Sequence, residues 1–341
     1  MHDDNAPRDT SWKQAIIRRQ RPVLRSSVWQ IVNTLVPYLA LWGLMVWSLS
    51  LSYWLTLALA VVAAGFLTRI FIIFHDCTHG SFLGSLPANR ILGFVTGVLT
   101  FTPYDQWRHK HSLHHAAAGD LDGRGTGDIW TLTVQEYMAA SRWKRFSYRL
   151  VRNPLVLFVV APLYLFLIHH RFPSLAGGKR ERRSVYLTNG ALLGIVVLMS
   201  QTIGIKAYLL IQAPVIVLAG MAGIWLFYVQ HQFEGVYWER RRDWDFMEAA
   251  LRGSSFYKLP RVLQWFSGNI GFHHIHHLSP AIPNYSLEKC HAENPVFQKV
   301  QAVTLWSSIK SLPLRLWDER RKKLVAFGQL KTIRRSVARS L

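Results

Sequence analysis

The sequence of 341 residues predicts an all-α integral membrane protein, in which four transmembrane helices form two hairpins and a cytoplasmic helical cap carries clustered histidines. Three observations support this prediction. Half of the residues are hydrophobic, and many of them lie in long apolar runs. The formal net charge is +21, and the basic residues lie almost entirely outside those runs. Eight of the fifteen histidines occur in three short clusters.

The first hairpin is expected from two apolar runs, at 28–47 and 53–74, which follow a charged N-terminal segment at 1–27. Each run has about 20 residues, the length that a helix needs to cross a bilayer. A buried helix of a soluble enzyme rarely stays apolar on all sides for so long. The short link at 48–52 makes the two helices antiparallel neighbours. Because 1–27 does not resemble a cleavable signal, we expect the first run to be a retained anchor.

Two shorter apolar stretches, at 91–101 and 154–168, come between the first hairpin and the second. If either crossed the membrane alone, the histidine clusters would lie on opposite faces. Both are shorter than a typical span, so we expect re-entrant or interfacial helices.

The second hairpin is expected from the apolar runs at 185–204 and 208–229, joined by a link at 205–207. The first hairpin ends directly before His75, and the second ends two residues before His231. Both hairpins therefore return to the same side and deliver histidines there. Together with the clusters they define one membrane domain at 28–291.

The remaining segment, at 292–341, is basic and has apolar residues at Leu312, Leu316 and Leu324. This pattern predicts an amphipathic helix that lies on the membrane surface.

The basic residues indicate the orientation of the chain in the membrane. They gather at 1–27, 142–183, 240–242 and beyond 315, whereas the links on the other side carry only Lys206. This is the positive-inside pattern, which predicts that both termini and the histidine clusters are cytoplasmic. The basic residues are not arranged as a surface that reads nucleic acid, so we expect no nucleic-acid partner.

The histidine clusters use spacings of three and four residues, which place imidazoles on one face of a helix. Imidazole binds zinc, copper, iron and nickel, and eight ligands are too many for one tetrahedral zinc. The clusters therefore predict at least two metal ions. The sequence has no H-E-x-x-H zinc motif and only one E-x-x-H, at Glu288. The clustered residues are His75, His79, His111, His114, His115, His273, His276 and His277.

The order H-x-x-x-H, H-x-x-H-H and a late H-x-x-H-H, separated by hydrophobic hairpins, resembles the integral-membrane fatty acid desaturases. The resemblance covers about 71–285, and HDCTHGSF and HHIHHLSPAIPNY look most like the bacterial acyl-lipid desaturases. It implies a non-haem centre of two iron ions (Fe2+/Fe3+), held almost wholly by histidine on the cytoplasmic side of a bacterial inner membrane. It also implies a ninth ligand, His231. One relative adds an asparagine one helical turn earlier, where this chain has Phe227.

The resemblance implies an O2-dependent oxidoreductase that introduces a cis double bond into a long acyl chain. Such a reaction needs two external electrons, and the sequence has no haem-binding H-P-G-G segment and no nucleotide or flavin motif. A separate donor is therefore expected, a ferredoxin or a cytochrome b5-like protein, which the basic cytoplasmic face would attract. The acyl chain that reacts could be bound to a membrane lipid, to a carrier protein or to CoA.

Two other functions share some of these features. Hydroxylases and ketolases of the same superfamily, which act on alkanes, sterols or carotenoids, have the same clusters, but the P-A-I-P-N-Y segment favours desaturation. A metal transporter would need charged residues within its spans, and only Arg69 lies in one.

Several further residues are candidates for supporting roles. Carboxylates near the clusters could orient imidazoles; these are Asp76, Asp120, Asp122 and Asp128, for each of which a loop or capping role is the alternative. An acyl tunnel could be lined by Gly80, Phe82, Tyr104, Trp107 and Trp265. His109 and His274 break the spacing of the clusters and are expected in outer or surface positions.

Overall fold

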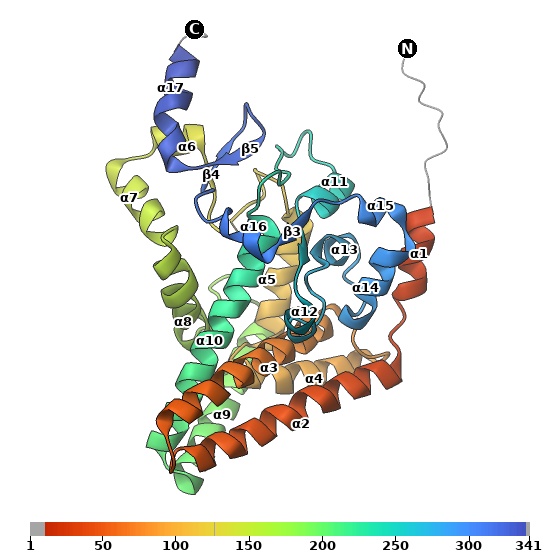
Figure 1. Cartoon of the computed structure of the whole chain (residues 1–341), viewed down its shortest axis with the longest axis vertical. Coiled ribbons are helices and arrows are strands. Elements are labelled where there is room, and N and C mark those ends of the chain that lie inside the picture. The colour runs from red at the N-terminus through yellow and green to blue at the C-terminus, as the bar shows by residue number, and fades with distance from the viewer. Residues whose placement is uncertain (1–10, 126, 339–341) are drawn as a thin grey trace.

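The computed structural model describes residues 11–125 and 127–338 (Figure 1), so residues 1–10 of the N-terminal segment and 339–341 of the tail lie outside it. In this part of the chain, four helices are long and apolar enough to cross a membrane. The predicted helical fold with four spans is confirmed. The four helices are α2 (Leu24–Ser48), α3 (Tyr53–His79), α9 (Lys179–Thr202) and α10 (Ile205–His231).

These helices form the two expected hairpins, α2 with α3 and α9 with α10, and α3 packs against α10. The helices α3 and α10 continue beyond their apolar runs to His79 and His231, so each carries predicted ligands in its last turn. The predicted link at 205–207 is wrong, because α10 already begins at Ile205. The turn lies at Gly204, whose φ of +85° ends α9, and hydropathy does not report such a conformation.

Both shorter apolar stretches are helical. The first forms α4 (Leu86–Leu99), which packs against α3. Ser85 caps its start, because the Ser85 side chain accepts a hydrogen bond from the backbone N of Ala88. The second follows α7 (Arg142–Val151) after a 64° bend. It consists of short π-helical, α-helical and 3-10 pieces within Val156–Arg171, among them α8 (Ala161–Leu163). Such a bend fits a broken span or a re-entrant segment, so the re-entrant path stays a prediction.

The cap lies at one end of the hairpins, and the described ends of the chain, α1 (Ser11–Arg19) and α17 (Leu330–Ala338), lie on that side (Figure 1). Its centre is α13 (His273–Leu278), which packs between α11 and α14 and is buried along its whole length. The other helices of the cap are α5 (Tyr104–Ala117), α6 (Val134–Ala139), α11 (Phe246–Arg252), α12 (Arg261–Phe266), α14 (Asn284–Glu293), α15 (Pro295–Gln298) and α16 (Leu305–Ile309).

The C-terminal segment differs from the helix predicted for it. Leu316 and Leu324 are buried in the antiparallel strands β4 (Leu316–Asp318) and β5 (Lys323–Val325), and β4 also pairs in parallel with β1 (Leu132–Thr133). Two further strands, β2 (Phe256–Lys258) and β3 (Ala302–Thr304), pair in parallel. The helix prediction is wrong at Leu316 and Leu324 because β1, which completes the sheet, is remote in sequence.

Candidate metal centre

Nine histidines from four helices converge in two groups, and within each group the candidate ligand atoms lie within 4.8 Å of one another. The structure therefore brings together all nine histidines selected from the sequence. The first group is His75, His79, His111, His115 and His276, and the second is His114, His231, His273 and His277.

Helix geometry explains how three clusters become two groups. On α5, His111 and His115 are one turn apart and join the first group, while His114 turns toward the second. On α13, His276 joins the first group and His273 joins the second. Each of these two helices therefore contributes to both groups and holds them next to each other.

The separations within the first group fit ligands that share one ion. The Nε2 atoms of His75 and His111 are 3.0 Å apart, those of His111 and His115 are 3.1 Å apart, and those of His115 and His276 are 3.0 Å apart. Nitrogens about 2.1 Å from a metal ion at right angles would be roughly 3 Å apart. The Nε2 atom of His79 is buried and has no hydrogen-bond partner among the described residues, as expected for an atom left for a metal.

The second group has the same spacing. The Nε2 atom of His231 lies 3.1 Å from that of His114 and 3.0 Å from that of His273, and the Nε2 atoms of His273 and His277 are 3.1 Å apart. Two groups of four and five imidazoles thus present nitrogen donors at separations suited to a transition metal.

Burial keeps the histidines of the cap in the form that binds metals. It lowers the pKa of these imidazoles well below the usual value, and neighbouring histidines act in the same direction. A neutral imidazole has a free lone pair, whereas a protonated one cannot bind a metal. The histidines concerned are His111, His115, His273, His276 and His277.

Three of the nine rings are oriented through their other nitrogen. The Nδ1 atom of His75 lies 3.0 Å from Asp76 Oδ1, and that of His114 lies 2.8 Å from Asp128 Oδ1. The Nδ1 atom of His231 lies 3.3 Å from the carbonyl oxygen of Gly253. An Nδ1 proton donated to these acceptors leaves Nε2 free to bind a metal, which is the usual arrangement at metal sites.

Asp76 is itself held by residues that the sequence analysis missed. Its Oδ2 atom accepts hydrogen bonds from the backbone N and the side-chain Nδ2 of Asn284, at 2.6 and 2.8 Å. Gln30 Nε2 in turn donates to Asn284 Oδ1 at 3.0 Å. All three side chains are buried. The P-N-Y sequence after the third cluster was the available signal, because it places a polar residue close to the ligands.

Two of the four carboxylates proposed from the sequence have a different role. Asp120 forms an ion pair with Arg241 at 2.9 Å, and Asp122 forms one with Arg240 at 2.6 Å. These pairs join the loop after α5 to the segment after α10. The predicted role of Asp120 and Asp122 as orienting groups is therefore wrong, and the loop role, also considered, is correct.

The two histidines that break the cluster spacing lie outside both groups. The side chain of His109 is exposed, and its Nδ1 atom is 3.9 Å from Glu181. His274 is buried, but its Nε2 atom faces His291 Nδ1 at 3.2 Å. Both positions agree with the expectation that they are not part of the centre.

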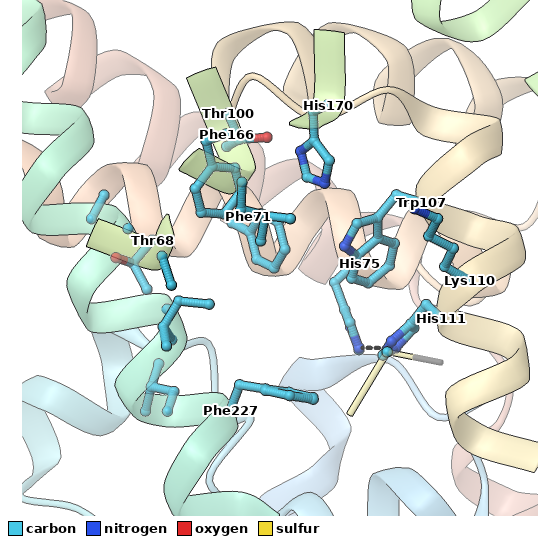
Figure 2. A pocket seen from close by; sticks show the side chains of 18 of the residues that line it. Thr68, Phe71, His75, Thr100, Trp107, Lys110, His111, Phe166, His170 and Phe227 are labelled. Carbon is cyan, nitrogen blue, oxygen red and sulfur yellow. Dashed lines mark hydrogen bonds between the residues drawn. The ribbon is translucent and has the colours of Figure 1, made fainter. Parts of the chain in front are cut away.

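A cavity of about 450 Å³ adjoins both histidine groups. Figure 2 shows it with His75 and His111 of the first group. His75, His111, His114 and His273 form part of its wall. The rest of the wall is mostly apolar and comes from α3, α5, α10 and the bent segment. Four aromatic side chains of this wall are Phe71, Trp107, Phe166 and Phe227.

Most of the residues suggested for a tunnel lie elsewhere, and among the five only Trp107 lines this cavity. Gly80 ends α3 with a φ of +72°, Tyr104 donates a hydrogen bond to the carbonyl oxygen of Cys77, and Trp265 packs against the guanidinium of Arg69. The five residues were proposed because they are close to the clusters in sequence. That closeness does not determine which face of a helix a residue occupies.

Phe227 stands where one relative has a ligating asparagine. Its ring centre is 5.3 Å from those of both His114 and His231, so it covers the second group with an apolar side chain.

The chain is similar to known proteins over most of its length. The family model for fatty acid desaturase matches residues 52–307. A fatty acid desaturase of Bacillus subtilis is 51% identical over 92% of this chain and 89% of the relative. An sn-1 oleoyl-lipid 12-desaturase of Synechocystis is 27% identical over 66% of this chain and 64% of its own length. An sn-1 acyl-lipid omega-3 desaturase (ferredoxin) from the same organism is 27% identical over 64% and 62%.

Proposed function

Because this chain belongs to the fatty acid desaturase family, we propose that its nine clustered histidines hold two iron ions at the active site of a membrane-embedded desaturase. The observation that carries the proposal is the division of the nine imidazoles into two adjacent groups, each with nitrogen separations near 3 Å. All nine predicted ligands are used, five for one ion and four for the other.

Bound iron would supply the activation of O2 and the removal of two hydrogens from neighbouring methylene groups of an acyl chain. The protein supplies the surroundings in which this chemistry is selective. Asp76 and Asp128 hold the Nδ1 protons of His75 and His114 and so keep their Nε2 atoms available. The apolar wall excludes water from the site, which protects reactive species from side reactions.

The cavity is the proposed binding site for the acyl chain. Its volume of about 450 Å³ lies within the range of roughly 300–1,000 Å³ that is typical of ligand sites. Phe71 and Phe166 line its apolar part, while His75 and His111 line its wall at the first histidine group (Figure 2). An acyl chain in this cavity would therefore pass directly beside candidate ligands of both ions.

The electrons are proposed to come from a separate protein. One relative is named as ferredoxin-dependent, and this chain carries exposed basic residues such as Arg242 on its cap. We place the cap and both termini in the cytoplasm, because Lys206 is the only charged residue in the links at the far ends of the hairpins. A basic face there would attract an acidic ferredoxin or cytochrome b5-like donor.

The substitution His114→Ala tests the proposal. We expect purified wild-type protein to hold two iron ions per chain and to form unsaturated fatty acids in a host that supplies saturated ones. His114→Ala removes a ligand of the second group and should lose both iron and product. Iron is measured by elemental analysis and Mössbauer spectroscopy, and products by mass spectrometry.

His109→Ala is the matched control, because His109 lies on the same helix but its side chain is exposed. It should keep its iron and its activity. A His114→Ala variant with full iron content would falsify the assignment. Hydroxylated rather than unsaturated products would overturn the reaction and leave the metal site intact.

A further inference from the structure

A pair of histidines outside both metal-binding groups connects the second group to the surface of the cap. His274 directly follows His273, a candidate ligand of the second group. His274 is fully buried, and its Nε2 atom lies 3.2 Å from the Nδ1 atom of His291 on α14. His291 is only half-buried and therefore reaches the surface. The candidate metal centre uses neither of these two side chains.

Aromatic packing holds the two rings in this contact. The ring centre of Phe256 lies 4.6 Å from that of His291 and 5.7 Å from that of His274. Phe272, the residue before His273, lies 5.1 Å from His291 and stacks on Phe256. An electron crosses a protein most readily through closely packed, hydrogen-bonded groups, because the rate of transfer falls steeply with distance. The two histidines therefore form a continuous path from the surface to His273.

The surface around His291 is basic. The helix α14 packs against α1 and α15, and these three helices lie together at one side of the cap (Figure 1). Glu293, two residues after His291, forms an ion pair with Arg19 of α1. A hydrogen bond from Arg19 lowers the pKa of Glu293, and the charges of Arg18 and Lys289 act in the same direction. Three cations thus surround one carboxylate.

Two exposed lysines extend this basic surface. Lys13 lies on α1, and Lys299 follows α15 directly. Together with Lys299, the helices α1, α14 and α15 carry five basic residues and two acidic ones, Glu288 and Glu293. The surface therefore has an excess of positive charge. We call it the α1–α14 surface; its basic residues are Lys13, Arg18, Arg19, Lys289 and Lys299.

The basic segment at 240–242, also on the cap, is matched by carboxylates instead. Arg240 pairs with Asp122, and Arg241 pairs with Asp120. Arg242 lies 3.4 Å from the carboxylate of the next residue. A protein attracts an acidic partner through the excess charge of its surface, so this segment offers less attraction than the α1–α14 surface. The α1–α14 surface also has the histidine path beneath it.

We propose that an acidic one-electron carrier protein docks on the α1–α14 surface and that its electrons pass through His291 and His274 to His273. This rests on the proposed function and names the docking site and the entry route of its donor. Each reduced carrier gives up one electron and is itself oxidised, and the electron reduces an iron ion of the second group from Fe3+ to Fe2+. No bond forms or breaks in this step, and two carriers serve one turnover.

Binding to the metal-free full chain tests the docking site without any turnover. The probe is a purified 2Fe–2S ferredoxin of negative net charge, and its association in uncharged detergent is followed by surface plasmon resonance at several salt concentrations. Lys289→Glu should lower the association rate constant about tenfold at low salt, because it reverses a charge within the docking surface. Lys289→Arg keeps the charge and should bind like the wild type.

Arg242→Glu is the matched control, because it makes the same change in net charge at another exposed position of the cap. It should change the association rate constant less than about twofold, since salt screens charges that lie away from the docked partner. Equal effects of Lys289→Glu and Arg242→Glu would show that net charge alone attracts the donor and would overturn the docking site. No effect of Lys289→Glu would overturn it as well.

Reduction of the iron-loaded protein tests the route. Reduced ferredoxin is mixed with the protein in the absence of O2 and acyl substrate, and its reoxidation is followed by stopped-flow absorbance. His291→Leu should slow the reoxidation severalfold at saturating ferredoxin, while the iron content and the affinity for ferredoxin stay unchanged. Reduced methyl viologen is a small reductant that does not need to dock, so it should reduce this variant as fast as the wild type.

His109→Leu is the control for the route, because His109 is an exposed histidine outside both groups, and it should accept electrons at the wild-type rate. His291→Gln keeps a polar partner for His274; it should slow the reoxidation less and serves if His291→Leu does not fold. An unchanged rate in either variant, or equal slowing with methyl viologen, would overturn the route. Wild-type protein without iron would overturn the proposed function instead, and ferredoxin binding to it would still be measurable.

Discussion

At the scale of single residues, the candidate centre depends on the division of labour between the two nitrogens of each imidazole. His75 and His114 direct Nε2 toward a histidine group and Nδ1 toward a buried carboxylate. The carboxylate selects the tautomer, restricts ring rotation and increases the electron density on the ligand nitrogen. Asp76 is further restrained by Asn284 from the segment after α13, so the first histidine cluster is oriented partly by residues that follow the third.

We therefore expect Asp76→Asn to lower the affinity for iron about 10- to 100-fold, the usual effect of removing an outer partner of a metal-bound histidine. The amide cannot serve both His75 and Asn284 as the carboxylate does. Iron titration of the metal-free protein, followed by optical or Mössbauer spectroscopy, measures the change. Asp122→Asn is the control, because Asp122 pairs with Arg240 on the surface. Equal iron affinity in both variants would show that Asp76 has no orienting role.

The residue scale also shows what the sequence could predict. Spacing identified the eight histidines of the three clusters, because i, i+3 and i+4 positions share a helix face whatever the fold. His231 has no such neighbour and was expected only from the family resemblance. The roles of Asn284 and Gln30 were not predictable in this way. Each depends on a contact across the fold, such as the hydrogen bond between Gln30 and Asn284, and no local periodicity reports that.

At the scale of helices, the ends of α3 and α10, rather than their middles, carry the candidate ligands. Hydropathy located the four spans because it detects the part of a helix that lipid surrounds. It did not locate the polar last turns of α3 and α10, where His75, His79 and His231 lie. It also could not anticipate strands at Leu316 and Leu324, because a three-residue strand depends on its partner strands rather than on its own sequence.

The end of α3 provides a prediction at this scale. Gly80 follows His79 directly and has a φ of +72°, and a Cβ there would lie 2.9 Å from the side chain of Leu86. Gly80→Ala should therefore destabilise the protein by about 1–2 kcal/mol and loosen His79. Thermal unfolding in detergent and iron content measure the two effects. Gly84→Ala is the control, because a Cβ at Gly84 meets nothing within 4 Å. Matching unfolding temperatures for the two variants would contradict this account of the helix end.

At the scale of the whole molecule, the hairpins and the cap separate two tasks. The spans hold the chain in the membrane, where acyl lipids are, and the cap gathers ligands from helices that are distant in sequence. The cavity between α3, α5, α10 and the bent segment joins the two regions. The path of that bent segment decides the orientation of everything that follows it, since a single crossing within 142–171 would place α9 the other way round.

Thiol labelling of the full chain in intact cells tests this path. Both native cysteines, Cys77 and Cys290, are buried, so single cysteines can be introduced against a low background. Lys206→Cys, at the far end of the second hairpin, should react with a membrane-impermeant reagent in intact cells. Arg242→Cys on the cap and Leu175→Cys after the bent segment should react only after permeabilisation, because positive-inside charge places both in the cytoplasm. Reaction of Leu175→Cys in intact cells would mean that the bent segment spans the membrane.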